Sequence, residues 1–335
     1  MINLTYDDIQ LVPAYSEISS RKNINLKTKI TSRYDLLIPL VAAPMGTVCD
    51  FAMSNEMRKM GGVGCLHRFM SIAEQESVIK KIVSSRNEDQ INMPIMAAVG
   101  ANGDFFERAQ ALIQSGAEII LIDVAHGHHK NVKDAIEKIK SIQSSVDVIA
   151  GNIATAKGAI DLQDWGADAL RVGVGGGSLC TTRIKTGFGV PNVTCLTEIL
   201  KVAKVPVIAD GGIRTSGDIS KALALGSSTV MLGSLLAGTE EAPGMLIQKN
   251  NGLYKKYSGA ASFDTKVTYG QEIRNIEGES TIIPYKGKLD LVISSLLDGV
   301  KSALSYAGAT NLNEFRPEYI QITNSGINEA KPHLL

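Results

Sequence analysis

Short apolar runs alternate with amphipathic segments along most of the chain. Eight of these runs are continuously apolar, which predicts parallel strands covered on both faces. The predicted strands lie at 40–44, 61–67, 95–100, 118–125, 147–153, 169–174, 206–211 and 229–235. Helical spacing of apolar residues recurs in 130–143, and 215–225 opens with Thr215 or Ser216 as an N-cap. About eight β/α units predict one α/β domain over 1–335, a closed (β/α)8 TIM barrel rather than an open doubly wound sheet.

Two predicted connections are much longer than the loops of most compact domains. One follows the sixth strand at 175–194, and the other follows the eighth strand at 237–288. In a barrel both rise from the C-terminal face, where active sites lie. We expect a catalytic loop in the first and a mobile lid that excludes water in the second. Glu277 and Arg274 are the lid's candidates for proton transfer and ion pairing.

Composition excludes several kinds of partner. The 335 residues include 34 basic and 34 acidic ones, so no net field draws the chain to nucleic acid or to a membrane surface. No apolar run approaches the roughly 20 residues of a membrane span. The four cysteines show no metal-ligand spacing, and the first residues do not resemble a signal peptide. We expect a cytoplasmic protein that binds a small molecule.

The segment GVGGGSLCTTRIKTGFG, at 173–189, carries the strongest chemical signal. Its glycines let backbone groups approach a ligand or ion without interference from Cβ atoms. Cys180 lies among them, where a thiolate would be a covalent nucleophile. The alternative is a small buried residue in a glycine-rich turn.

Glycine turns also follow the seventh and eighth strands. They read ADGGIRTSGD at 209–218 and MLGSLLAG at 231–238. In barrels these two loops commonly bind phosphate through backbone N–H groups. Either turn alone would be an ordinary tight turn, but the pair at these positions favours a phosphate site. Asp210, at the strand end, is a candidate acceptor for ribose hydroxyls.

Two other strand ends carry polar side chains. Asp123, in IDVAHGHH, is placed to contact a ligand. Asn152, in AGNIAT, is placed either to contact a nucleotide or to cap the next helix, and position alone leaves both open. His126, His128 and His129 suggest zinc, but no carboxylate or cysteine completes a ligand set, so we expect no metal there.

Together the motifs resemble the IMP dehydrogenase and GMP reductase family over essentially the whole chain. They are YDDIQLVPAYS, AAPMGTV, DVAHGH, AGNIAT, GGSLCTTRIKTGFG, ADGGIRTSGDI, VMLGSLLAGTEEAPG and IPYKG. The resemblance implies that Cys180 attacks C2 of the purine of a nucleoside monophosphate. The covalent thioimidate then exchanges hydride with a nicotinamide, while Thr182 and Glu277 handle protons.

The same resemblance implies three sets of binding residues. Nucleotide contacts would be Met45, Asn152, Ser178, Asp210, Gly211, Gly212, Gly233, Ser234, Tyr257, Gly259, Arg274 and Gly278. Cofactor contacts would be Ser20, Arg21, Arg68, Asp123, Val124, Ala125, Ser302 and Ser305. A monovalent cation such as K+ would bind carbonyls of Gly175, Gly177 and Cys180. Two positions depart from the family pattern: Gly176 replaces a usual proline, which loosens the loop, and Gly46 replaces a frequent acidic residue.

The lid separates the family's two activities. Dehydrogenases of the family share an Arg-Tyr pair within a GSSxRY sequence of the lid. The lid of this chain has Thr268-Tyr269, which is not that pair. Reductases carry a basic residue three places before the lid acid, as Arg274 stands before Glu277. The inserted pair of regulatory (CBS) domains is also missing, because LHRFMSIAEQ runs directly toward IMAAVG. The motifs APMGTV and CTTRIKTGFGVP instead resemble those of dehydrogenases.

We therefore expect a GMP reductase that uses NADPH to convert GMP to IMP and ammonia. The alternative is an IMP dehydrogenase without regulatory domains, which converts IMP and NAD to XMP. Arg21 and Arg68 suit the 2'-phosphate of NADPH, although both could be plain surface arginines. The family also implies a homotetramer whose last helix, around Ser302 to Ser305, reaches the neighbour's cofactor.

Two remote alternatives find little support. A catalytically silent nucleotide-binding barrel would have lost its nucleophile or lid acid, and Cys180, Thr182 and Glu277 are all present. A phosphosugar aldolase or isomerase would need a Schiff-base lysine at a strand end, and no predicted strand ends in one.

Overall fold

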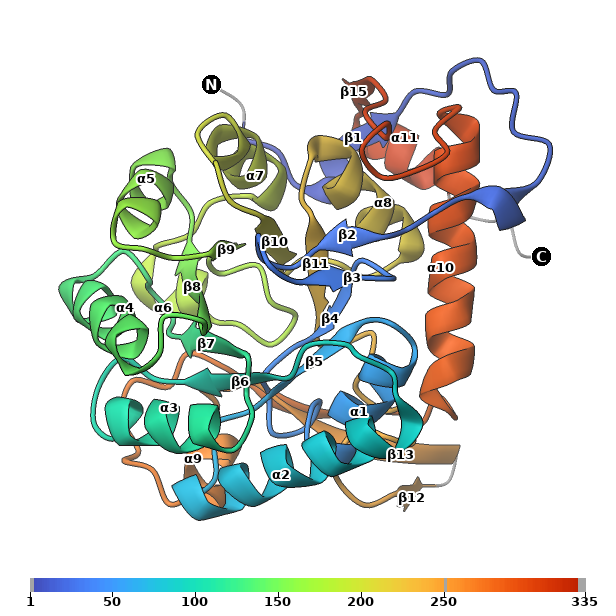
Figure 1. The fold of residues 1–335 in the computed structure, drawn as a ribbon. Coiled ribbons are helices and arrows are strands. Elements are labelled where there is room, and N and C mark those ends of the chain that lie inside the picture. Colours follow the sequence, from blue (N-terminus) through green and yellow to red (C-terminus); the bar gives the residue numbers. More distant parts are fainter. Residues whose placement is uncertain (1–2, 250–251, 331–335) are drawn as a thin grey trace.

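A computed structural model describes residues 3–249 and 252–330 of the chain. Residues 250–251 of the predicted lid, and 1–2 and 331–335 of the predicted domain, lie outside the described residues. Eight parallel strands form a closed barrel in which each strand pairs with the next and β11 pairs with β4 (Figure 1). They are β4 Leu40–Ala42, β5 Val63–Leu66, β6 Met96–Val99, β7 Ile119–Asp123, β8 Asp147–Ile153, β9 Ala169–Val172, β10 Val207–Asp210 and β11 Thr229–Leu232. Each lies within one predicted run, so the predicted TIM barrel is confirmed.

Side chains of each barrel strand alternate between two apolar clusters. In β7, Ile119 and Leu121 belong to the inner cluster, whereas Ile120 and Ile122 pack in the cluster that includes the helices. Both faces of the strand are thus buried, which explains the continuously apolar sequence. A hairpin of β2 Thr28–Lys29 and β3 Asp35–Leu36 covers the N-terminal end of the barrel, and its Leu36 completes the inner cluster.

Helices surround the barrel (Figure 1). The principal ones are α1 Phe51–Lys59, α2 Ile72–Asp89, α3 Phe105–Gln114, α4 Lys130–Ile142, α5 Ala156–Asp164, α7 Asn192–Leu200, α8 Ser216–Leu225 and α10 Leu289–Tyr306. Both predicted helices, α4 and α8, are confirmed. Thr215 is the N-cap of α8, because its hydroxyl accepts a 3.1 Å hydrogen bond from the Asp218 amide.

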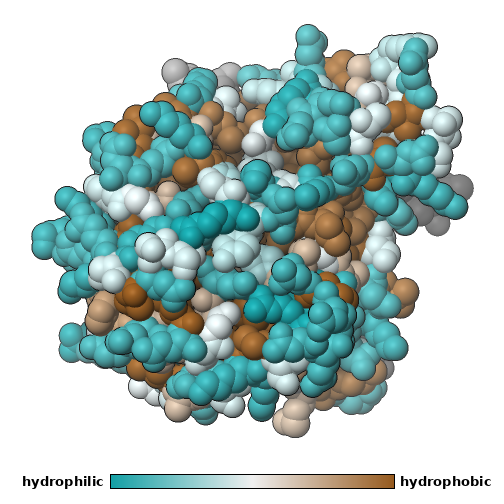
Figure 2. Space-filling model, in the orientation of Figure 1, coloured by the Kyte–Doolittle hydropathy of each residue, from teal (hydrophilic) through white to brown (hydrophobic). Residues whose placement is uncertain are grey.

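The chain's first and last parts meet outside the barrel. They form η1 Tyr6–Asp8, β1 Ile9–Leu11, η2 Arg21–Asn23, β15 Tyr319–Gln321 and α11 Asn324–Glu329, with β1 antiparallel to β15. Figure 2 shows a mostly polar surface on one face, with apolar residues in scattered groups. Within the described ranges, no helix is both long and apolar enough to cross a membrane.

The two long connections contain their own secondary structure. The cysteine loop includes the short helix α6 Thr182–Thr186 before α7 begins. The lid forms an antiparallel sheet of β12 Ile247–Lys249, β13 Gly252–Ser258 and β14 Ser280–Pro284, with helix α9 Phe263–Thr268 between the last two strands. One anchor of this lid is Lys255, which is buried and whose ammonium donates to the carbonyls of Glu240 and Ala242 at 3.0 and 2.6 Å. The mobility of the lid stays a prediction.

Candidate active site

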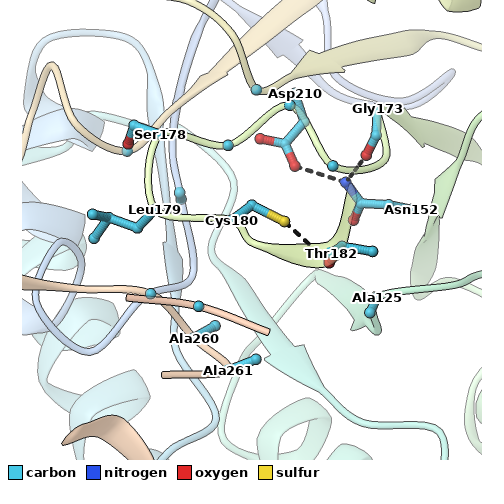
Figure 3. Close-up of a pocket in the computed structure, with 18 of the residues that line it drawn as sticks. Ala125, Asn152, Gly173, Ser178, Leu179, Cys180, Thr182, Asp210, Ala260 and Ala261 are labelled. Atoms are coloured by element: carbon cyan, nitrogen blue, oxygen red, sulfur yellow. Dashed lines mark hydrogen bonds between the residues drawn. The ribbon is translucent and has the colours of Figure 1, made fainter. Parts of the chain in front are cut away.

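A cavity of about 680 Å³ opens at the carboxyl ends of the barrel strands. Its walls come from the ends of β7, β8, β10 and β11, from the cysteine loop and from the lid (Figure 3). All three predicted catalytic residues line it. So do these predicted nucleotide contacts: Met45, Asn152, Ser178, Asp210, Gly211, Gly212, Gly233, Ser234, Tyr257, Gly259 and Gly278.

A chain of hydrogen bonds connects the three predicted catalytic side chains. The Cys180 thiol lies 3.1 Å from the Thr182 hydroxyl, to which it donates. That hydroxyl in turn donates to Glu277 Oε2 at 2.7 Å. The arrangement links a nucleophile to a carboxylate through one hydroxyl, so a proton held by the acid has a short path to a group bonded to the sulfur.

Backbone pairing places Glu277 beside the cysteine. The Thr181 amide donates to the Glu277 carbonyl at 3.0 Å, and the Glu279 amide donates to the Leu179 carbonyl at 2.9 Å. Cys180 and Gly278 thereby form an antiparallel bridge between the cysteine loop and the lid. The position of the acid therefore depends on main-chain hydrogen bonds on both sides of the nucleophile.

Asn152 extends toward the cavity. Its amide donates to Asp210 Oδ2 at 2.7 Å and to the Gly173 carbonyl at 2.8 Å (Figure 3). The next helix, α5, has Thr155 as its N-cap instead, with a 3.1 Å bond from the Gly158 amide. The capping alternative for Asn152 is therefore wrong, and the amide orients the Asp210 carboxylate.

Arg171, on β9, is a site residue that the sequence reasoning missed. Its guanidinium donates to Asp123 Oδ1 at 2.6 Å and to Asp210 Oδ2 at 2.9 Å. Burial lowers the pKa of Arg171, but the carboxylates of Asp210 and Asp123 together raise it above the ordinary value, so the group stays charged. The available signal was a single arginine within the apolar run ALRVGV.

The glycine turns and Tyr257 surround one end of the cavity. The Ser178 and Tyr257 hydroxyls are 3.0 Å apart. A Cβ atom at Gly233 would lie 3.1 Å from the Tyr257 oxygen and 3.3 Å from Met45 Sδ, so glycine keeps this space open. Burial raises the pKa of Tyr257, despite its bond with Ser178, and the phenol remains a proton donor.

The predicted cofactor residues divide into two groups. Arg68, Asp123, Val124 and Ala125 line the cavity, and the Arg68 guanidinium is 3.4 Å from Asp123 Oδ2. The structure does not bring the other four, Ser20, Arg21, Ser302 and Ser305, to this cavity. They lie in and beside η2 and α10, where the Arg21 guanidinium stands 5.8 Å above the centre of the Tyr306 ring.

Arg274 also lies apart from the cavity walls. Its side chain is 77% exposed and pairs with Glu272 Oε1 at 2.8 Å. Arg274 is therefore not among the residues that line the cavity, and its contact with the nucleotide stays a prediction. Lys266, which does line the cavity, instead donates to the carbonyls of Glu272 and Arg274.

The predicted cation ligands lie in a tight turn. The Gly177 carbonyl accepts a 3.1 Å hydrogen bond from the Cys180 amide, and Gly175 has a φ of 76°. One of the three carbonyls is thus already bonded within the loop, and the cation stays a prediction from resemblance. Elsewhere, His128 pairs with Asp161 Oδ2 at 2.8 Å, and the described residues contain no cluster of His, Cys, Asp or Glu suited to a metal ion.

A second cavity, of about 600 Å³, shares Arg68, Phe69 and Gln271 with the first. Tyr269 of the lid forms one of its walls and packs on Phe69, with ring centroids 5.9 Å apart. A Cβ atom at Gly46 would lie only 2.5 Å from the Tyr269 hydroxyl. A side chain at position 46 would therefore require the Tyr269 ring to move, and glycine leaves the space that the ring occupies.

Comparisons with known proteins agree on one family. The model of the IMP dehydrogenase / GMP reductase domain matches residues 3–333. The chain is 36% identical to the IMP dehydrogenase of Cryptosporidium parvum, over 98% of this chain and 94% of that protein. It is also 36% identical to the GMP reductase of Streptococcus pyogenes serotype M4, over 96% of this chain and 95% of that protein.

A solved structure shares the fold throughout. It is a cysteine-to-alanine variant of GMP reductase from Trypanosoma brucei in complex with guanosine 5'-monophosphate. The TM-score is 0.94 at 28% sequence identity, and the match covers 100% of this chain and 98% of that one.

Proposed function

Because this chain belongs to the IMP dehydrogenase and GMP reductase family of oxidoreductases, we propose that it is a GMP reductase. In this reaction NADPH reduces GMP to IMP with release of ammonia. The observation that carries the proposal is the position of Glu277, hydrogen-bonded through Thr182 to the nucleophile Cys180. Glu277 accepts from Thr182 in this arrangement, and once protonated it would return a proton along the same path to a leaving amine, as deamination requires.

The second candidate is an IMP dehydrogenase. Relatives of both kinds match over nearly the full chain, so the comparisons favour neither activity. A dehydrogenase must activate water for hydrolysis, and the resemblance assigns that role to a lid Arg-Tyr pair. Here Tyr269 packs on Phe69, and Arg274, the lid's single arginine, pairs with Glu272 in solvent. The absence of an Arg-Tyr pair counts against the dehydrogenase, whereas Arg274, the basic residue of the reductase pattern, makes no contact within the cavity here.

The residues suggest the following sequence of steps. The Cys180 sulfur bonds to C2 of the purine while Asn152 and Asp210 hold the nucleoside. The C2–N bond then breaks, and Glu277 delivers the leaving amine's proton through Thr182, which leaves a thioimidate and ammonia. Asp123, Val124 and Ala125 would hold the nicotinamide cofactor, which when bound would supply the hydride that C2 receives. Loss of the sulfur then frees IMP and regenerates the Cys180 thiolate.

The cavity has room and groups for the nicotinamide cofactor. Asp123, Val124 and Ala125 line it together with Cys180, and Arg68 stands where it meets the second cavity. Arg68 would hold the 2'-phosphate that distinguishes NADPH from NADH. A kcat/KM for NADH equal to that for NADPH would remove this assignment without affecting the choice of substrate.

The proposal is tested by two assays of the purified protein that follow the absorbance of reduced cofactor. GMP with NADPH should consume NADPH and yield IMP and ammonia in equal amounts. IMP with NAD should yield little or no XMP. Sustained XMP formation above about 1 turnover per second, an ordinary enzyme rate, would identify the dehydrogenase. Absence of turnover in both assays would contradict both candidate activities.

A further inference from the structure

Asn192, at the start of α7, lies between two loops of the site. Its side chain is buried, with 6% of the residue exposed. The amide nitrogen donates to the Gly211 carbonyl and lies 3.3 Å from the Asp210 carbonyl. One side of the amide is therefore fixed to the main chain that carries Asp210, the proposed ribose contact.

The other side of the Asn192 amide contacts the cysteine loop at Gly176. A Cβ atom at Gly176 would lie 2.6 Å from Asn192 Oδ1 and 3.0 Å from Nδ2. Only glycine at position 176 leaves space for the amide in this position. The turn in which the Gly177 carbonyl accepts from the Cys180 amide follows directly, so a shift at Gly176 would move the nucleophile.

We propose that Asn192 is a positioning residue that sets the distance between Cys180 and a nucleotide held by Asp210. The amide holds the cysteine loop against the loop after β10, at the position where the family's usual proline is replaced by Gly176. The Asn192 amide restrains the backbone at position 176 by packing and hydrogen bonding. A proline at that position would restrain the same backbone by fixing its φ. The proposal rests on the proposed function, in which Cys180 acts on the nucleotide.

Two substitutions disturb this contact from opposite sides. Asn192→Ala removes the amide, and Gly176→Ala fills the space that the amide occupies. Each should lower kcat with GMP about 10- to 100-fold, as expected for an ångström-scale misplacement of a reacting group, while the dissociation constant for GMP changes less than about threefold. Asn192→Asp keeps the shape without the N–H donor and should resemble Asn192→Ala. Asn313→Ala, an exposed asparagine, is the matched control.

The double variant Gly176→Ala with Asn192→Ala distinguishes positioning from general destabilisation. Because both single changes disturb one contact, the double variant should be no slower than the slower single variant. Losses of kcat that multiply would overturn the proposal. So would a kcat per folded molecule equal to that of the wild type in Asn192→Ala, since Asn192 would then serve only stability.

A second measurement does not depend on which nucleotide is the substrate. Iodoacetamide labelling of Cys180, followed by mass spectrometry, reports how firmly the loop holds the thiol. Labelling should be several-fold faster in Asn192→Ala and Gly176→Ala than in the wild type or Asn313→Ala. Unchanged labelling in both variants would overturn the role of Asn192. Failure of the GMP assay alone would count against the proposed function and not against this contact.

Discussion

Glu277 and Thr182 are 95 residues apart in the chain, and the 2.7 Å hydrogen bond between their side chains joins the lid to the cysteine loop. The carboxylate therefore reaches the nucleophile only when the lid is docked. Glu277→Gln keeps the size of the side chain but removes the acid, so kcat should fall by about 10²- to 10⁴-fold with little change in GMP affinity. Glu279→Gln, an exposed acid two residues away, is the control and should keep wild-type kcat.

A substitution of Thr182 tests the same hydrogen-bonded path between Cys180 and Glu277. Thr182→Ala removes the group that bonds both Cys180 and Glu277, and it should slow turnover about as much as Glu277→Gln. Because the two residues act together, the double variant should be little slower than either single one. Multiplied losses in steady-state kinetics would show separate roles.

Cys180→Ala should bind GMP and yet lose turnover by several orders of magnitude, because the covalent step has no nucleophile. Isothermal titration would measure binding, and NADPH oxidation would measure turnover. Cys195→Ala is the matched change at a buried cysteine and should stay active. More than about a tenth of wild-type activity in Cys180→Ala would end its assignment as nucleophile.

The buried Arg171 holds two carboxylates from different strands. Arg171→Met would leave Asp123 and Asp210 without their shared cation, and it should lower the free energy of unfolding by about 3 to 5 kcal/mol. Urea denaturation would measure this loss. Because the two acids line the cavity where the proposed function places the cofactor and the ribose, KM for both substrates should also rise. Lys130→Met, at an exposed position, should change neither quantity.

His67 should make the protein less stable in mild acid. Burial lowers its pKa from the ordinary 6.5 to about 4, and its unprotonated Nδ1 accepts a 3.1 Å bond from the Phe69 amide. Between pH 6.5 and 4 the unfolded chain binds this proton and the folded chain does not. The free energy of unfolding should therefore fall by roughly 3 kcal/mol as the pH drops through that range.

Urea denaturation at several pH values would measure this loss. His67→Asn keeps an acceptor without titrating, so its unfolding free energy should depend less on pH. His129→Asn, at an exposed position, should retain the wild-type dependence. Equal pH dependence in all three proteins would show that other groups cause the acid sensitivity.

The barrel was predictable because its signal is local. Each barrel strand lies within a mostly apolar run, and the cap at Thr215 lies beside the helix that it begins. Arg171 was not predictable, since its charge is compensated by partners on β7 and β10 that only the closed barrel brings near. The lid sheet was missed for the same reason, because β13 and β14 pair across 21 intervening residues, from Ser258 to Ser280. Arg274 fits a family position in the sequence, yet its side chain lies in solvent.

The lid hairpin carries two different contacts with the site. Tyr257, on β13, pairs in register with Thr281 on β14, and Glu277 lies just before that strand. The resemblance assigns Tyr257 to the nucleotide's 5'-phosphate, and the proposed function assigns the acid to Glu277, so both proposed roles belong to one structural unit. Under this proposal guanosine, which has no phosphate, would lack a contact that helps to seat the acid. Selectivity for the monophosphate over the nucleoside should then appear in kcat as well as in KM. Binding energy from the phosphate, which is far from C2, would lower the barrier to reaction at C2.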